Sequence, residues 1–151
     1  MTNRSDLIVQ YFNYLISEYG YQIAEKEFNP DAMGNAYVIF MSSKIGIEVT
    51  IDRNNVFIAI GEHSHPRREW FEFSDVIKYF APSIKNVYDF PEKTEEQSWD
   101  SIVEIQLNNL ATMLHRYCKP LLGGEIWLND EFKNNEEKRL VEILSRLKKK
   151  S

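Results

Sequence analysis

The sequence predicts an α+β fold: an N-terminal helix, an antiparallel meander of three to five strands, and C-terminal helices packed on the sheet. Apolar residues recur at helical spacing near the N-terminus and again after residue 98. Between these stretches, apolar and polar residues alternate over 45–60, as they do in half-buried strands. Because helices and strands come in separate runs, a parallel βαβ sheet is not expected.

All 151 residues, 1–151, are expected to form one domain. Hydrophobic residues make up 43% of the chain and charged residues 27%, which is typical of globular proteins and excludes intrinsic disorder. The chain contains no internal repeat, low-complexity tract or interdomain linker.

The first predicted helix begins at Ser5 and ends before Gly20. Ser5 has the hydroxyl group of a common N-cap, Asp6 suits the positive end of a helix, and Gly20 is a natural stop. Apolar residues four apart form one stripe along this helix, namely Leu7, Ile8, Tyr11, Phe12, Leu15, Ile16 and Tyr19.

The sheet is predicted from the alternating segment. The alternation is interrupted by a turn at 52–55, where Asn and Asp tolerate a left-handed backbone. Pro66 ends or bends the third strand because it has no N–H group to donate. The strands are expected at 37–41, 45–51 and 56–60, with further strand residues at 21–28 and 70–73.

Three helices are predicted after the sheet. A short helix begins at Ser74 and a long one near Ser98, since serine is a common N-cap. An acidic loop over 86–97 separates them, and Pro120 marks the end of the long helix or a kink in it. Apolar residues at helical spacing predict a last helix over 136–148.

Composition favours the cytosol and argues against several classes of protein. Cys118 is the single cysteine and cannot form an intramolecular disulfide, which favours a reducing compartment. The N-terminus lacks a signal-peptide pattern, and no stretch approaches the roughly 18 consecutive apolar residues of a membrane span. A net charge of −5 without a basic stripe argues against nucleic-acid binding.

An acidic segment over 89–104 is a candidate surface for a basic protein partner. It contains six acidic residues against Lys93 alone, and opposite charges guide association without strict geometry. Alternatively, Asp100 and Glu104, four apart on a helix, act as ligands or as acid and base, or the whole set is simply solvated. The candidate docking residues are Glu92, Glu95, Glu96, Asp100 and Glu104.

A second set of candidate partner-binding residues combines arginine with tryptophan, residue types that are enriched in binding hot spots. Arg67 and Arg68 follow the third strand and precede Trp70. Trp127 follows a Gly-Gly pair further along the chain. Alternatively, Trp70 covers the sheet while both arginines stay in water, and Trp127 packs on the core.

Two histidine arrangements are candidate metal or catalytic sites. On an extended strand, His63 and His65 would point to the same side and could share a metal ion, although a usable site needs further ligands. Otherwise they form a polar strand end that faces water. His115 and Cys118 are neighbours on a helix surface and suit a thiolate nucleophile or half of a zinc site. The alternative is that Cys118 is buried as a small apolar group.

No dinucleotide-binding glycine motif, Walker loop, nucleophile elbow or Cys-x-x-Cys pair is present in the sequence, so no cofactor is expected. We expect a non-enzymatic cytosolic protein-binding domain, a monomer or weak homodimer, whose partner is basic at its contact surface. The overall layout resembles small bacterial immunity and antitoxin proteins, which is an architectural analogy. The alternatives are a small metal-dependent or acid–base enzyme using His63 and His65, and a structural subunit that oligomerises through an aromatic face.

Overall fold

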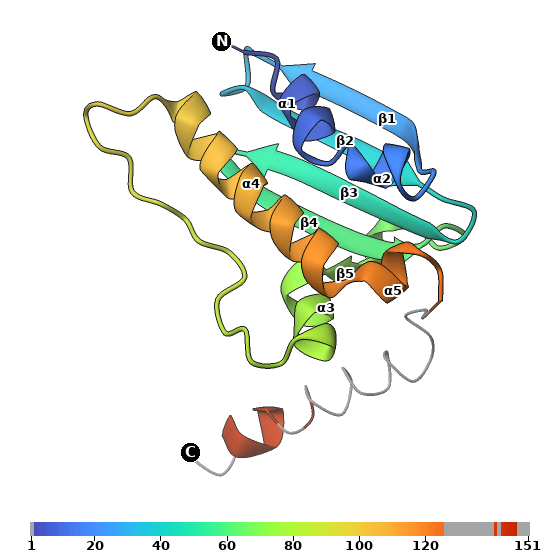
Figure 1. Ribbon diagram of the computed structural model, residues 1–151. Coiled ribbons are helices and arrows are strands. Elements are labelled where there is room, and N and C mark those ends of the chain that lie inside the picture. Colours follow the sequence, from blue (N-terminus) through green and yellow to red (C-terminus); the bar gives the residue numbers. More distant parts are fainter. Residues whose placement is uncertain (1, 126–140, 142, 148–151) are drawn as a thin grey trace.

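The computed structural model describes residues 2–125, 141 and 143–147, and Figure 1 shows their arrangement. Five strands form an antiparallel meander in which each strand pairs with its neighbour in the sequence. The strands are β1 (Gln22–Asn29), β2 (Asn35–Met41), β3 (Ile45–Asp52), β4 (Asn55–Glu62) and β5 (Phe71–Glu72). The predicted meander is therefore confirmed, including the additional strands near 21–28 and 70–73.

The α-helices α1, α2, α4 and α5 lie on one face of the sheet (Figure 1), as the predicted α+β class requires. Within the described ranges, no helix is both long and apolar enough to cross a membrane. The helices are α1 (Arg4–Tyr11), α2 (Tyr14–Ser17), α3 (Phe73–Phe80), α4 (Trp99–Tyr117) and α5 (Lys119–Leu122), with a 3₁₀ turn η1 (Arg67–Glu69).

The core lies between the sheet and these helices. Inward-facing residues of β3 and β4 alternate with less buried ones, as the sequence pattern predicts. Among the deeply buried strand residues of this core are Val38, Phe40, Ile45, Ile47, Val49, Ile51, Val56, Ile58 and Ile60. The cluster continues through residues of α1, α2, α4 and the segment between α1 and α2, among them Ile8, Phe12, Leu15, Leu107 and Leu114.

The connection between β3 and β4 is a two-residue turn, since Asp52 pairs with Asn55. Both turn residues have positive φ angles, 49° at Arg53 and 66° at Asn54. Turns of this kind match the twist of the flanking strands, and Asn adopts the left-handed conformation readily. The predicted turn at 52–55 is confirmed.

The N-terminal helix differs from its prediction at both its start and its length. Asn3, not Ser5, is the N-cap, because the Asn3 side chain accepts the N–H groups of Ser5 and Asp6. The helix then breaks after Tyr11 and resumes as α2, instead of running to Gly20. The break has no proline or glycine to mark it in the sequence.

The start of α3 lies one residue before the predicted one. Its N-cap is Glu72, whose carboxylate accepts the N–H of Ser74 at 2.7 Å. The helix therefore begins at Phe73. A glutamate is an uncommon N-cap, which is why the sequence pointed to Ser74 instead.

The long helix α4 begins after Ser98, as predicted, and the hydroxyl of Ser98 accepts the N–H of Ser101 at 3.0 Å. Residues 81–98 before it lie outside helices and strands, which agrees with the predicted loop. Within the predicted last helix, residues 141 and 143–147 are helical, and the rest of the range 136–148 lies outside the described residues.

The outer edge of β4 is closed by side chains. The buried Gln106 of α4 accepts the N–H of Val56 at 3.0 Å and donates to the carbonyl of Asn54 at 2.8 Å. The Tyr88 hydroxyl lies 3.2 Å from the backbone nitrogen of Ile58 and 3.3 Å from its carbonyl oxygen. β5 pairs with the next two residues of the strand. Backbone groups that leave water need such partners, and here the partners come from outside the sheet.

The buried Arg4 links the N-terminal segment to the outer edge of β4. Arg4 is 1% exposed, and its Nε lies 3.1 Å from Oδ1 of Asp100. Its Nη1 donates to the side chain of Asn54 at 2.8 Å and to the carbonyl of Met33 at 3.2 Å. Burial alone would raise the pKa of Asp100, but the bonds from Arg4 and from the N–H of Thr2 hold that pKa below its ordinary value.

Candidate functional site

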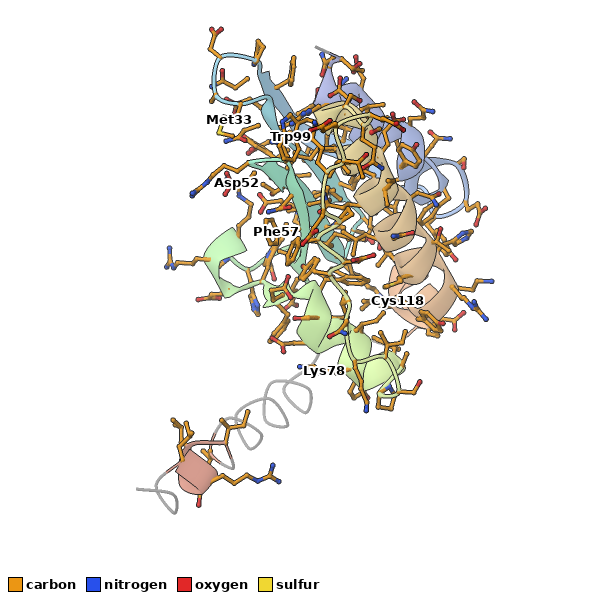
Figure 2. The ribbon with its side chains drawn as sticks, turned by 90° about the vertical axis from the view of Figure 1, so that its left-hand side faces the viewer. Met33, Asp52, Phe57, Lys78, Trp99 and Cys118 are labelled. Carbon is orange, nitrogen blue, oxygen red and sulfur yellow. The ribbon has the colours of Figure 1, made fainter. Side chains whose placement is uncertain are left out.

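The face of the sheet that points away from the helices carries several carboxylates at outward-facing strand positions. In Figure 2, Asp52 lies on the side of the sheet away from α4. We call this surface the acidic sheet face. It consists of the carboxylates Glu25, Glu27, Glu48 and Asp52, with Tyr37, Thr50 and Phe57 between them.

The strand register arranges these side chains in rows across the sheet. In one row, Glu25 pairs with Ile39, which pairs in turn with Glu48. Directly paired side chains stand about 4.5–5.5 Å apart on one face of a sheet, so Glu25 and Glu48 flank the buried Ile39. The next row, from β1 to β4, consists of Glu27, Tyr37, Thr50 and Phe57.

One end of this side of the sheet is covered by Trp70. Its ring packs on Gly46 and Gly61, where an added Cβ would come within 2.2 Å and 2.0 Å of the indole. Its Nε1 donates to the carbonyl oxygens of Glu62 at 3.2 Å and His65 at 3.1 Å. The ring is 8% exposed. The side chain therefore covers the sheet, which agrees with the alternative interpretation of Trp70.

Arg67 of η1 reaches into the acidic sheet face. Its Nη1 lies 2.6 Å from Oε2 of Glu48 and 3.9 Å from Oε2 of Glu25, and its guanidinium carbon lies 5.6 Å from the centre of the Tyr37 ring. The Tyr37 hydroxyl donates to Glu25 at 3.1 Å. The carboxylates of Glu27 and Glu25 raise the pKa of Tyr37, which reflects the negative potential of this surface.

The arginine–tryptophan set is thus divided by the fold. Arg67 contacts the acidic sheet face, Trp70 is buried, and Arg68 is exposed beside them. Trp127 lies outside the described residues.

A hollow of about 260 Å³ lies at the far end of the acidic sheet face from Trp70. Asp52 stands there 3.4 Å from the amide nitrogen of Asn35 and 3.6 Å from Nε of the exposed Arg53. The Asn35 amide oxygen already accepts the N–H of Arg53 at 2.9 Å. The carboxylate of Asp52 in an open hollow suits the cationic end of a lysine or arginine side chain. The hollow is lined by Glu27, Asn29, Ala32, Asn35, Ala36, Tyr37, Thr50, Ile51 and Asp52.

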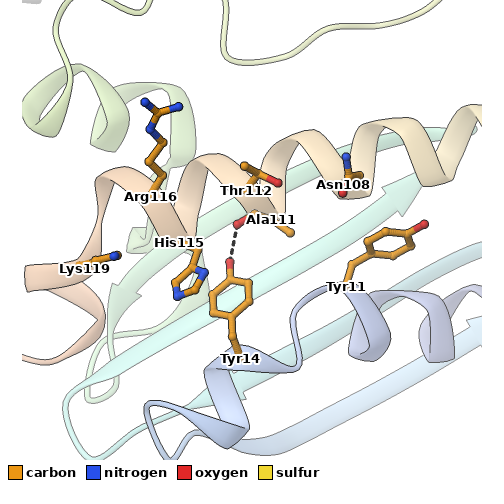
Figure 3. Close-up of a pocket in the computed structure, with 8 residues that line it drawn as sticks. All are labelled: Tyr11, Tyr14, Asn108, Ala111, Thr112, His115, Arg116 and Lys119. Atoms are coloured by element: carbon orange, nitrogen blue, oxygen red, sulfur yellow. Dashed lines mark hydrogen bonds between the residues drawn. The ribbon is translucent and has the colours of Figure 1, made fainter.

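A second groove, of about 340 Å³, lies between α1, α2 and α4 (Figure 3). The Tyr14 hydroxyl donates to the Ala111 carbonyl at 2.7 Å, and burial raises the pKa of Tyr14. His115 stacks on the Tyr14 ring at 4.2 Å between centroids, and its Nε2 lies 2.9 Å from Oε2 of Glu18. These polar groups are occupied in joining α2 to α4. The groove is also lined by Tyr11, Asn108, Thr112, Arg116 and Lys119.

Cys118 is fully buried at the end of α4. Burial raises the pKa of its thiol to about 12, so the thiol is protonated at neutral pH. A protonated, inaccessible thiol is neither a nucleophile nor a ready zinc ligand. The interpretation of Cys118 as a small apolar group is confirmed, and His115 contacts Tyr14 and Glu18 instead.

His63 and His65 do not lie on a strand, because β4 ends at Glu62. His63 Nδ1 lies 2.8 Å from the Ser42 carbonyl, and His65 Nε2 lies 3.0 Å from the Glu62 carboxylate. The shared orientation that an extended strand would impose is therefore missing. Within residues 2–125, 141 and 143–147, no three His, Cys, Asp or Glu side chains are grouped so that they could hold a metal ion.

The acidic segment is divided between contacts within the chain and exposed loop. Asp100 pairs with the buried Arg4, and Glu104 accepts the Tyr11 hydroxyl at 3.0 Å. Both carboxylates therefore hold α4 against the N-terminal segment. The four that are exposed in the loop before α4 are Asp89, Glu92, Glu95 and Glu96.

The acidic sheet face was not among the sequence candidates. Its signal was the polar half of the alternation in 45–52, where Glu48 and Asp52 were treated only as solvent-facing positions. That they share a surface with Glu25 and Glu27 depends on the pairing of three strands.

In comparisons with known proteins, the chain matches no protein-family model, no curated protein and no solved structure.

Proposed function

We propose that the protein is a non-enzymatic protein-binding domain whose acidic sheet face binds a basic segment of a protein partner. The observation that carries this proposal is the charge of the acidic sheet face. Four carboxylates stand on it, and two arginines, Arg67 and Arg53, contact them. The surface is left with an excess of negative charge beside aromatic rings, a combination that suits arginine and lysine side chains.

The dimensions of the surface favour a protein segment over a small molecule. Neighbouring strands lie about 4.8 Å apart, so the row from Glu27 on β1 to Phe57 on β4 spans roughly 14 Å. This row is open, whereas small-molecule sites enclose most of their ligand. In the groove near Tyr14, by contrast, the hydroxyl of Tyr14 and Nε2 of His115 already have partners within the chain.

The exposed carboxylates of the loop extend the negative surface. Phe90 of this loop is 51% exposed, and its ring lies 5.9 Å from that of Phe57. Glu92, Glu95 and Glu96 follow Phe90 in the chain. In this proposal they act as rim charges, which speed the encounter with a basic partner more than they strengthen the final complex.

Neutralisation of a basic toxin, as immunity and antitoxin proteins perform it, is the cellular role that best suits this proposal. A toxic protein whose activity is blocked by this chain, and restored by loss of the acidic sheet face, would support that role. The enzyme alternative has less support, because His63 and His65 contact Ser42 and Glu62 rather than a common centre.

The test uses a labelled ten-residue peptide in which Arg and Thr alternate, and it measures binding by fluorescence anisotropy. Replacing Glu27→Gln together with Asp52→Asn should weaken binding about tenfold, because two charge-assisted contacts are lost. The control pair, Glu18→Gln with Glu104→Gln, removes the same charge from the helical side. It should change the Kd less than about twofold. Equal losses in both pairs, or no binding by the wild-type chain, would overturn the proposal.

A further inference from the structure

The outer edge of β1 is unpaired within the part of the chain that the structure describes. β1 stands at the end of the strand order and pairs only with β2 among the described strands. In an antiparallel sheet, alternate residues of an edge strand direct their N–H and C=O groups away from the neighbouring strand. These groups form a template on which a further strand can pair.

The two faces of β1 carry different charges. Lys26 points to the helical side, where it forms an ion pair with Asp6 of α1. Glu25 and Glu27 point to the acidic sheet face, where each pairs across the ladder with an uncharged residue of β2. A strand added beside β1 would therefore meet Glu27 and Glu25 on one face, the second of which also contacts Arg67 and the Tyr37 hydroxyl. On the other face it would meet Lys26, which is already paired.

This arrangement disfavours a second copy of the chain as the added strand. When two copies of one strand pair antiparallel in a continuous sheet, their equivalent side chains stay on the same face. Pairing of β1 with β1 would bring Glu25 and Glu27 of both copies together on that face. Like charges opposite each other are destabilising, so the edge is better suited to a basic strand.

We infer that β1 binds the partner by strand addition, with Arg or Lys at alternate positions of the added strand facing Glu25 and Glu27. The inference rests on the proposed function and specifies its geometry: the backbone of β1 supplies hydrogen bonds, and the two carboxylates select the side chains. The exposed Ile23 and the half-buried Phe28 offer apolar contacts toward the two ends of the strand.

The test compares the alternating Arg–Thr peptide with two N-methylated versions of it. One version is methylated at every Arg and the other at every Thr. In an added strand only one of these sets donates to β1, so one version should bind about tenfold more weakly. The other should bind within about twofold of the parent peptide, because its methyl groups face solvent. Equal effects in the two versions would overturn strand addition.

Two further readouts separate this inference from the proposed function. If the parent peptide binds and both methylated peptides bind equally, the acidic sheet face still binds basic segments but β1 does not pair with them. If the parent peptide does not bind at all, the proposed function itself fails. Sedimentation velocity tests whether a second copy of the chain pairs with β1 instead. If the chain forms a dimer, and dimer formation slows hydrogen exchange of the amides in 22–29, the edge binds another copy and the inference is overturned.

Discussion

The two edges of the sheet end in opposite ways, although β1 and β4 are both strands of eight residues. At β4, buried polar side chains and β5 take up the outward backbone groups. At β1, no strand pairs on the outer side among the described residues, and nearly all of its side chains are exposed. The outward backbone groups of a strand beside the core need hydrogen-bond partners within the protein, because they leave water. The backbone groups of a charged edge strand in solvent can still pair with a further strand.

We therefore expect the stability of the fold to depend on the edge at β4, and partner binding to depend on the edge at β1. Substitutions at the closed edge should change the free energy of unfolding, and substitutions on the acidic side should change binding with little effect on unfolding.

Arg4→Met should have the largest effect, a loss of about 4 kcal/mol in the free energy of unfolding, because it leaves a buried amide and a carboxylate without their partner. Asn54 and Asp100 are those partners, and Asn54 is where the closed edge begins. Urea unfolding measures the loss. Arg68→Met, which removes an exposed arginine, should change stability by less than about 0.5 kcal/mol and serves as the control.

The same variant should alter the dependence of stability on pH. The pKa of Asp100 is held below its ordinary value in the folded protein. A carboxyl group of this kind stabilises the fold above the ordinary pKa of about 4 and loses that contribution as the pH falls through its folded pKa. The difference between wild type and Arg4→Met should therefore be largest at neutral pH and shrink below about pH 4. A difference that is constant down to pH 2 would contradict this role of Asp100.

Gln106→Leu should have the second-largest effect, about 3 kcal/mol, since it leaves the N–H of Val56 and the carbonyl of Asn54 buried without partners. The leucine side chain fills similar space, so the loss reports the hydrogen bonds more than a cavity. Asn108→Leu, which removes an amide from the exposed side of α4, should be nearly neutral. Similar losses in the two variants would show that the edge does not depend on Gln106.

Tyr88→Phe should cost about 1 kcal/mol, because it removes one hydroxyl and keeps the ring. The hydroxyl also contacts Glu72, the N-cap of α3. Hydrogen exchange of the Ile58 amide, which the hydroxyl faces, should accelerate more than that of the other β4 amides. Tyr117→Phe, at the end of α4, is the matched control.

The fold was predictable because its signals are local. The alternation in 45–51 and 56–60, the turn at 52–55 and the Ser98 cap each depend on neighbours in the sequence. The break between α1 and α2 was not predictable, since Phe12 and Leu15 continue the apolar stripe through it and both become fully buried. Tertiary packing, not a helix-breaking residue, accompanies this break.

The candidate site was less predictable, because it depends on contacts between distant residues. Asp100 belonged to the acidic segment in the sequence, yet Arg4, 96 positions away, pairs with it. Glu25 and Glu48 join one surface only through the register of β1, β2 and β3. Residue type alone therefore showed where acidic residues occur in the sequence. It did not show which of their carboxylates form ion pairs within the chain.

The smallest expected effect concerns the exposed carboxylates of the loop before α4. Reversing two of them, Glu95→Lys with Glu96→Lys, should slow association with the basic peptide severalfold and leave dissociation nearly unchanged, because rim charges act on the encounter. The slowing should diminish as salt is raised, since the Debye length falls to about 3 Å at 1 M ionic strength. Stopped-flow fluorescence at two salt concentrations measures both rates.

The control for this effect is a charge reversal on the helical side, Glu18→Lys with Glu125→Lys, which alters the net charge equally. If the rim charges act locally, this pair should slow association less than the loop pair does, because the potential of an exposed charge is screened within about 10 Å at 0.1 M salt. Equal slowing would mean that net charge alone attracts the peptide. An unchanged association rate in the loop variant would leave Glu92, Glu95 and Glu96 as solvated side chains, with the acidic sheet face acting without them.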